Sequence, residues 1–464
     1  MSLRFFNTQT REVAEFLPIE NGRVRMYTCG PTVYNHAHIG NFRAYVFEDL
    51  LQRHLEFRGH KVERVMNLTD VDDKTIRGCR AAGVPLAVFT EPFKKAFFED
   101  LDALRIRRDA RFPEATEAGH IARMIEMIGV LIQRGHAYSA EDGSVYFRIS
   151  SFPRYGQLAH INLDELKPSG RVNSDEYEKE QIGDFALWKA WTEADGDVWW
   201  ESPWGRGRPG WHIECSAMAT GLLGPQIDIH CGGEDNIFPH HEAEIAQSEC
   251  VTGLPFVRLW MHCKHLLVDG KKMAKSEGNF FTLRDLKEKG WTGREVRYAL
   301  LSVKYREPLN FTMEGLEAAR KALARLDEWS RRLEEFASGA AEALPEELDP
   351  EKFGAALDDD LNISAALGAL FDLIRDSNRL MDQSSLSSGQ ARTLLAWLER
   401  IHSVLALVSD SEAVPEAVQA LADRRAQARA NKDWALSDAL RDELLALGWQ
   451  VKDTKDGQKL SRKS

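Results

Sequence analysis

One short stretch near the start of the chain, YTCGPTVYNHAHIGN at residues 27–41, carries a cysteine followed closely by two histidines. Thiolate and imidazole are among the ligands that Zn²⁺ binds most often in proteins. Cys29, His36 and His38 could therefore hold one metal ion together. The alternative is that the stretch serves two chemistries, with the cysteine facing one ligand and the histidines another. Deciding between them requires the elements that position these side chains.

Two segments flank the stretch and predict a strand before it and a helix after it. Residues 24–28 are short and apolar and stop at Cys-Gly-Pro, which is typical of a buried strand. Residues 41–57 carry apolar side chains at helical spacing, and Gly59 is a typical stop. A second strand is expected at 61–68. Strand, helix and strand in succession predict a right-handed βαβ unit with a parallel sheet.

On this arrangement the string HAHIGN lies where a strand has ended and a helix begins. The first turn of a helix exposes unpaired N–H groups and the positive end of the helix dipole, so it favours phosphates. Gly40 allows a ligand to approach the backbone closely, and His38 and Asn41 add side-chain donors. The segment therefore predicts a nucleotide triphosphate site. The alternative is helix capping and turn chemistry with no ligand.

A second basic segment, DGKKMAKSEGN from Asp269, combines three lysines with two glycines. Lys271, Lys272 and Lys275 on a mobile loop could place ammonium groups on a polyphosphate. Alone, such a run is more often a solvated loop. In this order on an α/β chain, the two segments together are far more specific for nucleotide chemistry than either one.

Composition limits the class of protein. A chain of 464 residues predicts about two to four domains. With 43% hydrophobic and 28% charged residues and no signal-peptide or membrane-spanning run, we expect a globular protein of the cytoplasm with no membrane partner. Six cysteines are too few for a disulfide scaffold of this length. The net charge of −12 argues against nucleic-acid binding by bulk charge alone, although local basic surfaces are compatible with it.

The rest of the chain changes character twice. Residues 90–140 are expected to be helical, and 141–205 carry short strand-like pieces, turns and several tryptophans, typical of an insertion. The α/β pattern resumes near 210 and continues to about 260. Beyond Phe311 almost the whole chain is expected to be helical, with apolar stripes of a bundle core. The last 44 residues hold ten Lys and Arg against seven Asp and Glu, a net of +3 in an acidic protein.

These motifs together resemble a known family. HIGN and KMAKS are similar to the two signature motifs of class I aminoacyl-tRNA synthetases. CGPTVYNHAHIGN, NLTDVDDK, GWHIECSAMA, FPHHEAEIAQSE, KKMAKSEGNF and two C-terminal segments resemble the cysteinyl-tRNA synthetases in their order, over essentially the whole chain. This chain departs from the pattern at three positions. Asn41 replaces the usual second histidine of the first motif, Ala274 replaces the usual serine of the second, and Leu460 stands where an aromatic is common.

The resemblance implies an α/β fold: a Rossmann-like class I catalytic domain with a parallel sheet and an insertion, then a helical bundle and a small anticodon-binding domain. The expected domains are the first catalytic half (1–115), an insertion that binds the acceptor end (116–205), the second catalytic half with the zinc ligands (206–260), the second-motif loop and stem-contact region (261–308), the helical bundle (309–410) and the anticodon-binding domain (411–464).

It also implies one Zn²⁺ at the bottom of a cysteine pocket, held by Cys29, Cys215, His240 and Glu244. His240 and Glu244 would share a face of a helix after Pro239, since they lie four residues apart. Cys231 remains an alternative ligand. By the same resemblance Thr69 and Trp211 would line the cysteine pocket, and Asp235 would accept the substrate ammonium or contact the ribose. The remaining cysteines and histidines are expected to be structural or to support the ligands: Cys79, Cys250, Cys263, His230, His241 and His262.

The implied reaction has two steps. The cysteine carboxylate attacks the α-phosphate of ATP, and a hydroxyl of the terminal tRNA adenosine, the 2′-OH in class I enzymes, then attacks the adenylate carbonyl. His38, Asn41, Lys272 and Lys275 would stabilise the phosphates with Mg²⁺, and His36 and Gly40 would also contact ATP. The partners would be L-cysteine, ATP and tRNA(Cys), bound by a monomer.

Anticodon recognition is expected in the basic C-terminal segment, since RNA loops are recognised by stacking as well as by charge. The alternative is a solvated helical tail. The candidate contacts are Arg424, Arg425, Arg429, Trp434 and Trp449.

Two other functions remain open. One is a ligase of the same fold that joins cysteine to a small amine, which would not need the family-like tail from about residue 411. The other is a catalytically silent RNA-binding or regulatory paralogue. Asn41 and Ala274 are the hints toward the second, whereas the lysines and the zinc quartet weigh against it.

Overall fold

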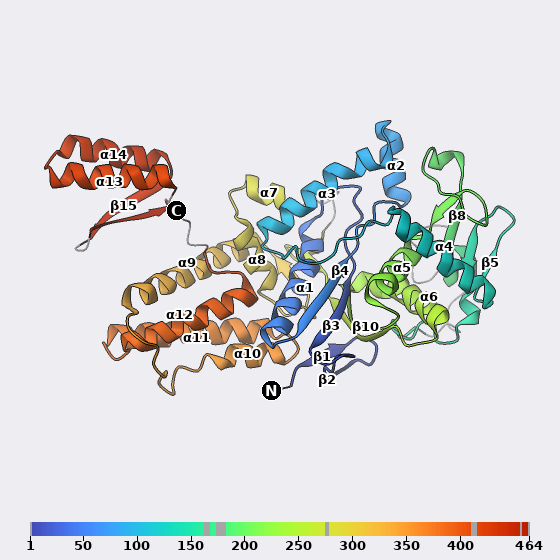
Figure 1. Cartoon of the computed structure of the whole chain (residues 1–464), viewed down its shortest axis with the longest axis horizontal. Coiled ribbons are helices and arrows are strands. Elements are labelled where there is room, and N and C mark those ends of the chain that lie inside the picture. Colours follow the sequence, from blue (N-terminus) through green and yellow to red (C-terminus); the bar gives the residue numbers. More distant parts are fainter. Residues whose placement is uncertain are drawn as a thin grey trace. The chain divides into compact units, whose positions relative to one another are not determined.

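Figure 1 shows the protein as a computed structural model, which describes residues 2–161, 168–172, 182–273, 278–409, 415–454 and 457–462. The chain divides into two compact units, Met1–Leu407 and Val408–Ser464. No helix in the described ranges is long and apolar enough to cross a membrane.

The larger unit is built around a four-stranded parallel sheet. Its strands are β3 (Arg23–Thr28), β4 (Lys61–Met66), β10 (Ile227–Gly233) and β11 (Val257–Cys263), in the order β11-β10-β3-β4. Helix α1 (Ile39–Phe57) connects β3 to β4. The predicted strand, helix and strand and the parallel pairing are confirmed.

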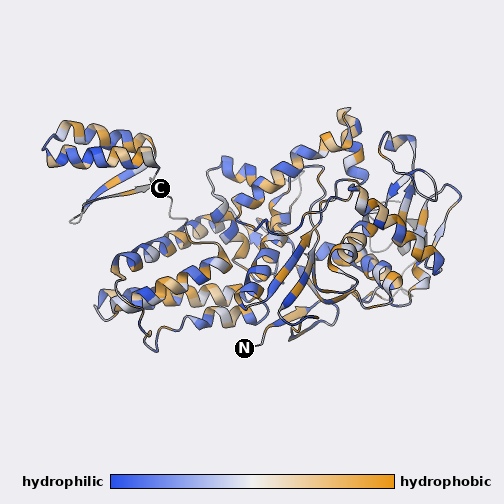
Figure 2. Ribbon diagram, in the orientation of Figure 1, coloured by the Kyte–Doolittle hydropathy of each residue, from blue (hydrophilic) through white to orange (hydrophobic). Residues whose placement is uncertain are grey.

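Helices cover both faces of this sheet, so its strands are buried on both sides (Figures 1 and 2). On one face, Val24 and Met26 share a core with Phe47 and Leu51 of α1. On the other face, Tyr27 and Val65 share a core with α5 (Trp211–Leu223) and α6 (Glu242–Thr252). This burial explains the apolar runs in the sequence. Successive side chains of a strand point to opposite faces of the sheet, and each face here packs against its own core.

The strand order reverses between β3 and β10. From β3 the chain crosses to β4 on one side, and from β10 it crosses to β11 on the other. In open α/β sheets ligands bind in the crevice at the carboxyl ends of the strands at such a switch point. Cys29 follows β3 directly, and Glu234 and Asp235 follow β10, so the segments expected to carry the chemistry lie at this crevice.

The region between β4 and α5 holds further helices and a mixed sheet. Its helices are α2 (Asp73–Ala82), α3 (Leu86–Ala103) and α4 (Ala118–Gln133), and residues 104–117 are not helical, which corrects the expectation of helix across 90–140. The sheet pairs strands in the order β5-β6-β8-β7, with β9 against β8. These strands are β5 (Ala137–Ser139), β6 (Val145–Phe147), β7 (Pro168–Val172), β8 (Ile182–Ala190) and β9 (Gly207–Pro209).

The remaining elements of the larger unit are a small sheet, an N-terminal hairpin and the helical bundle. Leu316, Leu323 and Leu326 of α9 and Leu370 and Ile374 of α11 are buried, so the apolar stripes do form a bundle core. The hairpin and small sheet are β1 (Arg4–Asn7), β2 (Glu12–Glu15), β12 (Leu266–Val268), β13 (Lys271–Lys272) and β14 (Leu309–Phe311). The helices are α7 (Leu283–Glu288), α8 (Gly293–Leu301), α9 (Met313–Phe336), α10 (Glu351–Asp358), α11 (Ile363–Asp382) and α12 (Ser388–Leu405).

The smaller unit has two helices and a β-hairpin. They are α13 (Glu416–Ala430), α14 (Trp434–Ala446), β15 (Trp449–Thr454) and β16 (Gly457–Arg462), and the two strands pair antiparallel. The prediction that the chain beyond Phe311 is almost wholly helical is confirmed for α9 to α14, and this hairpin is the exception to it in the described residues. Leu460 lies opposite Val451 in the hairpin and packs on the core of this unit.

Two residues proposed above as RNA contacts belong instead to the framework of this smaller unit. Trp449 is 5% exposed and lies in its core. Arg425 is 3% exposed, and its guanidinium donates to Asp453 at 2.9 and 3.0 Å and to Gln458 at 2.9 Å. A basic or aromatic residue type does not reveal burial, and here the side chains pack inward. Arg424 and Trp434 are exposed, and Arg429 is half-buried.

Candidate functional site

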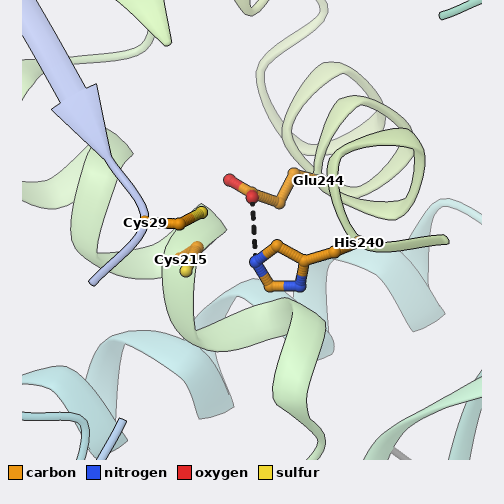
Figure 3. A group of neighbouring side chains, drawn as sticks. All are labelled: Cys29, Cys215, His240 and Glu244. Carbon is orange, nitrogen blue, oxygen red and sulfur yellow. Dashed lines mark ion pairs between the residues drawn. The ribbon is translucent and has the colours of Figure 1, made fainter. Parts of the chain in front are cut away.

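Two cysteines, a histidine and a glutamate converge at the crevice. Cys29 follows β3, Cys215 lies in α5, His240 lies in a short irregular helical stretch, Ile237–His241, and Glu244 lies in the first turn of α6 (Figure 3). One ligand atom of each lies within 4.8 Å of the others, and all four side chains are buried. His240 Nε2 lies 3.2 Å from Glu244 Oε1. The four residues expected to bind zinc are thus brought together.

Local backbone features make this convergence possible. Phe238 has extended dihedral angles, φ −137° and ψ 132°, inside the Ile237–His241 stretch, so the chain kinks just before α6. At the other side of the site, a Cβ on Gly30 would lie 1.7 Å from the carbonyl oxygen of Asn67. Only glycine allows the segment after Cys29 to pass this close to the segment after β4. Trp211 stacks on the His240 ring with centroids 4.2 Å apart.

The electrostatics of the group suit a cation. Burial raises the pKa of the Cys29 thiol well above its usual value. Burial acts to raise the pKa of the Cys215 thiol as well. A hydrogen bond with Cys29 and the charge of His240 outweigh burial, so the pKa of Cys215 lies well below its usual value. Burial lowers the pKa of His240, yet Cys215 and Glu244 raise it overall. A thiol with a lowered pKa thus lies beside an imidazole with a raised pKa, and a divalent cation could take the place of protons in this group. The donor set fits Zn²⁺.

A second, overlapping group of potential ligands is present. Cys29, His230, His241 and Glu244 also offer ligand atoms within 4.8 Å of one another. His230 Nε2 lies 3.0 Å from Glu244 Oε2, and His241 Nε2 lies 3.2 Å from Cys29 Sγ. Burial lowers the pKa of His230 to about 4, so its ring is neutral at pH 7. This set has only one thiolate to balance a dication, and we favour the quartet that includes Cys215.

Further side chains support these groups. His241 Nδ1 lies 2.7 Å from His262 Nε2, and His212 Nδ1 lies 3.0 Å from His240 Nδ1. Burial lowers the pKa of His262 to about 3. His212 was missed from the sequence, although its position three residues before Cys215 on one helix was an available signal. Tyr27, fully buried beside Cys215, was missed as well.

The other buried cysteines lie elsewhere. Cys231 packs with Met26 and Leu259 in the core on the opposite face of the sheet, which rules it out as a member of this group. Cys79, Cys250 and Cys263 are buried free thiols, as expected.

The three residues expected around the substrate cysteine differ in how far they are exposed. Thr69 is 1% exposed, and its hydroxyl accepts from Asn67 Nδ2 at 3.1 Å. Trp211 is half-buried over His240. Asp235 is exposed in the turn that follows β10. A pocket wall of Thr69 and Trp211 is therefore compatible with the structure, and Asp235 lies at the rim of the crevice.

The start of α1 has the geometry of a helix cap. His38 is the N-cap residue: its Nδ1 accepts from the backbone N–H of Asn41 at 3.2 Å, and Asn41 Oδ1 accepts from the backbone N–H of His38 at 3.1 Å. Asn41 thus completes a reciprocal capping pair. The first turn of α1 follows the carboxyl end of β3, and the positive end of the helix dipole there favours an anion.

The segment around the second motif lies against this cap. Ile39 N donates to Phe281 O at 3.0 Å, and the His38 ring packs edge-on to Phe280 at 5.2 Å. A Cβ on Gly40 would lie 3.1 Å from the Met273 methyl, so glycine admits this side chain. Lys272 is exposed in β13. Ala274 and Lys275 lie outside the described residues, and the role of Lys275 stays a prediction.

His36 packs toward α3. Its ring lies edge-on to Phe93 with centroids 5.5 Å apart, and the side chain is half-buried. Burial, assisted by the positive charge of Arg284, lowers the pKa of His36, so the ring is neutral at pH 7. A neutral ring can stack on a base or donate one hydrogen bond, and its contact with ATP stays a prediction.

Asp100 of α3, near Arg284, gives a testable pH dependence. It is 2% exposed, and burial raises the pKa of its carboxyl to about 6 against the opposing charges of Arg284 and Lys287. Because this pKa lies above the unfolded value, the stability from the protonated form is complete below about pH 4 and is lost as the pH rises through about 6. Asp100→Asn should therefore be more stable than the parent at pH 7, by about 1–3 kcal/mol, and equally stable at pH 4. Urea unfolding of both proteins at pH 4 and pH 7 checks this. The prediction would be contradicted if, from pH 4 to pH 7, the free energy of unfolding of the parent rose relative to that of the variant.

Comparison with protein families assigns most of the chain. Residues 15–321 match the catalytic domain of class I (C) tRNA synthetases, 352–409 match the DALR domain, and 411–459 match the anticodon-binding domain of cysteinyl-tRNA ligase. The chain is 50% identical to a cysteine–tRNA ligase of Chlamydia pneumoniae, covering 99% of this chain and 98% of that protein. It is 49% identical to one of Protochlamydia amoebophila, with the same coverage of each chain.

Solved structures show the same fold at low identity. Methionyl-tRNA synthetase of Mycobacterium tuberculosis bound by methionyl-adenylate aligns with a TM-score of 0.61 at 17% identity, covering 83% of this chain and 88% of that one. LeuRS of Agrobacterium radiobacter K84, in a ternary complex with tRNA, aligns with a TM-score of 0.61 at 12% identity, covering 84% and 85%. These likenesses establish the class I synthetase fold.

Proposed function

The chain belongs to the class I cysteinyl-tRNA synthetases, and we propose that it joins L-cysteine to tRNA(Cys) through a cysteinyl-adenylate and selects cysteine over serine with a zinc ion. The observation that carries the proposal is the buried group of Cys29, Cys215, His240 and Glu244 at the switch point of the sheet, next to a helix N-terminus suited to phosphate. ATP with Mg²⁺ is the second substrate.

The quartet would hold Zn²⁺ with a position left for a further ligand. When bound, the ion supplies a soft electrophilic site that the thiolate of cysteine matches and the hydroxyl of serine matches poorly. The chain's own residues set the pocket: Trp211 stacks on His240 and restricts the space above it, and Thr69 lies buried at the neighbouring strand end. An apolar pocket alone distinguishes isosteres by about 1–3 kcal/mol, so direct ligation explains stronger selection.

For the first step, the residues around α1 would bind and orient ATP. The cap formed by His38 and Asn41 fixes the first turn of the helix, where the positive end of the helix dipole would favour the phosphates. Lys272 and Lys275 would place positive charge on the phosphates as pyrophosphate leaves. His36 and Gly40 would contact the nucleotide, and Asp235 at the rim would contact the ammonium of cysteine or the ribose.

For the second step, the 2′-hydroxyl of the terminal adenosine forms the ester bond to the cysteinyl carbonyl carbon. The bond between that carbon and the phosphate oxygen breaks, AMP leaves with the electron pair, and the hydroxyl proton passes to water. The larger part of the tRNA would be bound elsewhere, with the anticodon on the smaller unit.

The rival functions make different predictions. A ligase that joins cysteine to a small amine has no need of an anticodon-binding domain, whereas 411–459 match one. A silent paralogue would lack adenylation. We would therefore measure charging of tRNA(Cys) with radiolabelled cysteine by the purified protein, alongside ATP–pyrophosphate exchange. Charging of tRNA supports the proposal; cysteine-dependent exchange with charging of a sugar amine alone would support the first rival, and no exchange would support the second. Monomeric state and cytoplasmic location stay predictions.

Trp434 offers a test of anticodon binding. It is 56% exposed at the start of α14, with the Arg429 guanidinium 5.5 Å from its ring centroid. Stacking of a base on such a ring is worth ~1–3 kcal/mol. Trp434→Ala should lower kcat/KM for tRNA(Cys) by about tenfold and leave ATP–pyrophosphate exchange unchanged. Leu436→Ala, on the same helix and 42% exposed, is the control and should change neither. Equal charging by both variants would place the anticodon elsewhere.

A further inference from the structure

The loop that joins β3 to α1 runs from the buried group of Cys29, Cys215, His240 and Glu244 to the first turn of α1, and it is held at both ends. Cys29 begins it at the metal group, and His38 ends it as the cap of α1. Between them, Val33 N donates to Thr69 O at 3.0 Å, and Thr69 N donates to Pro31 O at 3.1 Å. The loop is thus fixed against the segment that follows β4, and its side chains have defined directions.

Tyr34 is the exposed side chain of this loop. It is 38% exposed, whereas its neighbour Val33 is 2% exposed. From Cys29 to Asn41, a segment described in full, every other side chain is buried or half-buried. A single exposed tyrosine needs no explanation by itself. This one lies on a fixed loop whose two ends contact the expected cysteine and ATP sites.

A cation lies over the same ring. Lys74 Nζ is 5.2 Å from the centroid of Tyr34. Lys74 is in the first turn of α2, where Asp72 caps the helix by accepting from Lys74 N and Thr75 N. Lys74 and Thr69 belong to one segment, so the strand end that lines the expected cysteine pocket also brings a positive charge to Tyr34. The ring offers a face for a base, and the ammonium offers a partner for a phosphate.

We propose that Tyr34 is the stacking platform for the terminal adenosine of the tRNA, with Lys74 meeting the phosphate of that end. This inference rests on the proposed function, because it concerns its second step. The 3′ end of a tRNA is single-stranded, and single-stranded bases are held by aromatic stacking next to basic side chains. The 2′-hydroxyl must reach the carbonyl of the cysteinyl-adenylate, which would lie between the cysteine pocket and the first turn of α1. The loop of Tyr34 spans that interval.

The two half-reactions separate this role from others. We would compare Tyr34→Ala and Tyr34→Phe with the parent in cysteine-dependent ATP–pyrophosphate exchange, which needs no tRNA, and in single-turnover transfer from preformed adenylate to tRNA(Cys). Transfer by Tyr34→Ala should fall about 5- to 150-fold, the fold-change that corresponds to ~1–3 kcal/mol. Tyr34→Phe keeps the ring and should stay within about twofold of the parent. Lys74→Gln should also slow transfer and should flatten its dependence on salt.

Phe336→Ala is the control, since Phe336 is 39% exposed at the end of α9, and it should change neither half-reaction. Unchanged transfer by Tyr34→Ala would overturn the inference while leaving the proposed function intact. An equal loss of exchange and transfer would also overturn it, because Tyr34 would then serve cysteine or ATP. A parent that makes adenylate but transfers nothing to tRNA would show instead that the proposed function is wrong.

Discussion

Replacing Cys215 by serine is expected to remove the proposed zinc ion and to lower cysteine-dependent ATP–pyrophosphate exchange by at least ~10³-fold, because the substrate thiolate would then lose the ion that ligates it. Cys215 is 1% exposed, and burial acts to raise its pKa, but a hydrogen bond with Cys29 and the charge of His240 hold that pKa well below its usual value. A serine hydroxyl has nearly the same volume but does not ionise there. Zinc content, measured by atomic emission on dialysed protein, is the first readout, and exchange is the second.

Two variants separate the alternatives for the metal. If the ion were held by Cys29, His230, His241 and Glu244, His230→Gln would lose zinc and Cys215→Ser would keep it. Cys231→Ala is the matched cysteine control, because Cys231 is equally buried but packs on the other face of the sheet. It should retain one zinc per chain and exchange at the parental rate. Stoichiometric zinc in Cys215→Ser would contradict the assignment.

Replacing His38 by alanine is expected to lower ATP–pyrophosphate exchange by about 10²–10³-fold, the usual cost of removing one donor that stabilises charge in a transition state. His38 has two roles in the structure. Its Nδ1 accepts the backbone N–H of Asn41, so its loss also removes a cap worth ~1 kcal/mol. Exchange kinetics and urea unfolding, measured on the same preparation, give the two losses separately.

Variants can divide these roles. His38→Asn should keep the cap, since asparagine is a good N-cap residue, but should not recover exchange. Thr312→Ala removes a comparable cap from α9, where the Thr312 hydroxyl accepts from Gly315 N at 2.9 Å. It should lose similar stability and keep full exchange. If His38→Asn exchanged like the parent, His38 would serve only to cap the helix.

The elements that position the site were predictable where the pattern was local. The strand before Cys29 and the helix after His38 followed from apolar spacing, and the parallel pairing followed from their order. The C-terminal hairpin was missed even though Trp449 and Val451 alternate with polar residues and the dipeptide Asp-Gly, a common hairpin signal, precedes Gln458 in the sequence. Its basic and aromatic residues favoured contacts with an RNA loop, and Trp449 was included among them, whereas the structure buries this side chain in the core of the smaller unit.

The metal group was only partly accessible to sequence reasoning. His240 and Glu244 are four residues apart, so a helical pattern relates them directly. No local pattern relates Cys29 to Cys215, and that pair came from the family resemblance. His212 and Tyr27 were missed because their contacts depend on how α5 packs on β3. Conversely, Cys231 was retained as an alternative although its place in β10 turns it to the opposite face of the sheet.

The most direct test of zinc-based selection is the ultraviolet absorption of the Co²⁺-substituted protein, since each thiolate bound to cobalt adds charge-transfer intensity. With direct ligation, L-cysteine should increase this band by the contribution of one further thiolate, and L-serine at the same concentration should leave it unchanged. No increase at a cysteine concentration that saturates ATP–pyrophosphate exchange would contradict direct ligation, and selection would then have to come from the shape of the pocket alone.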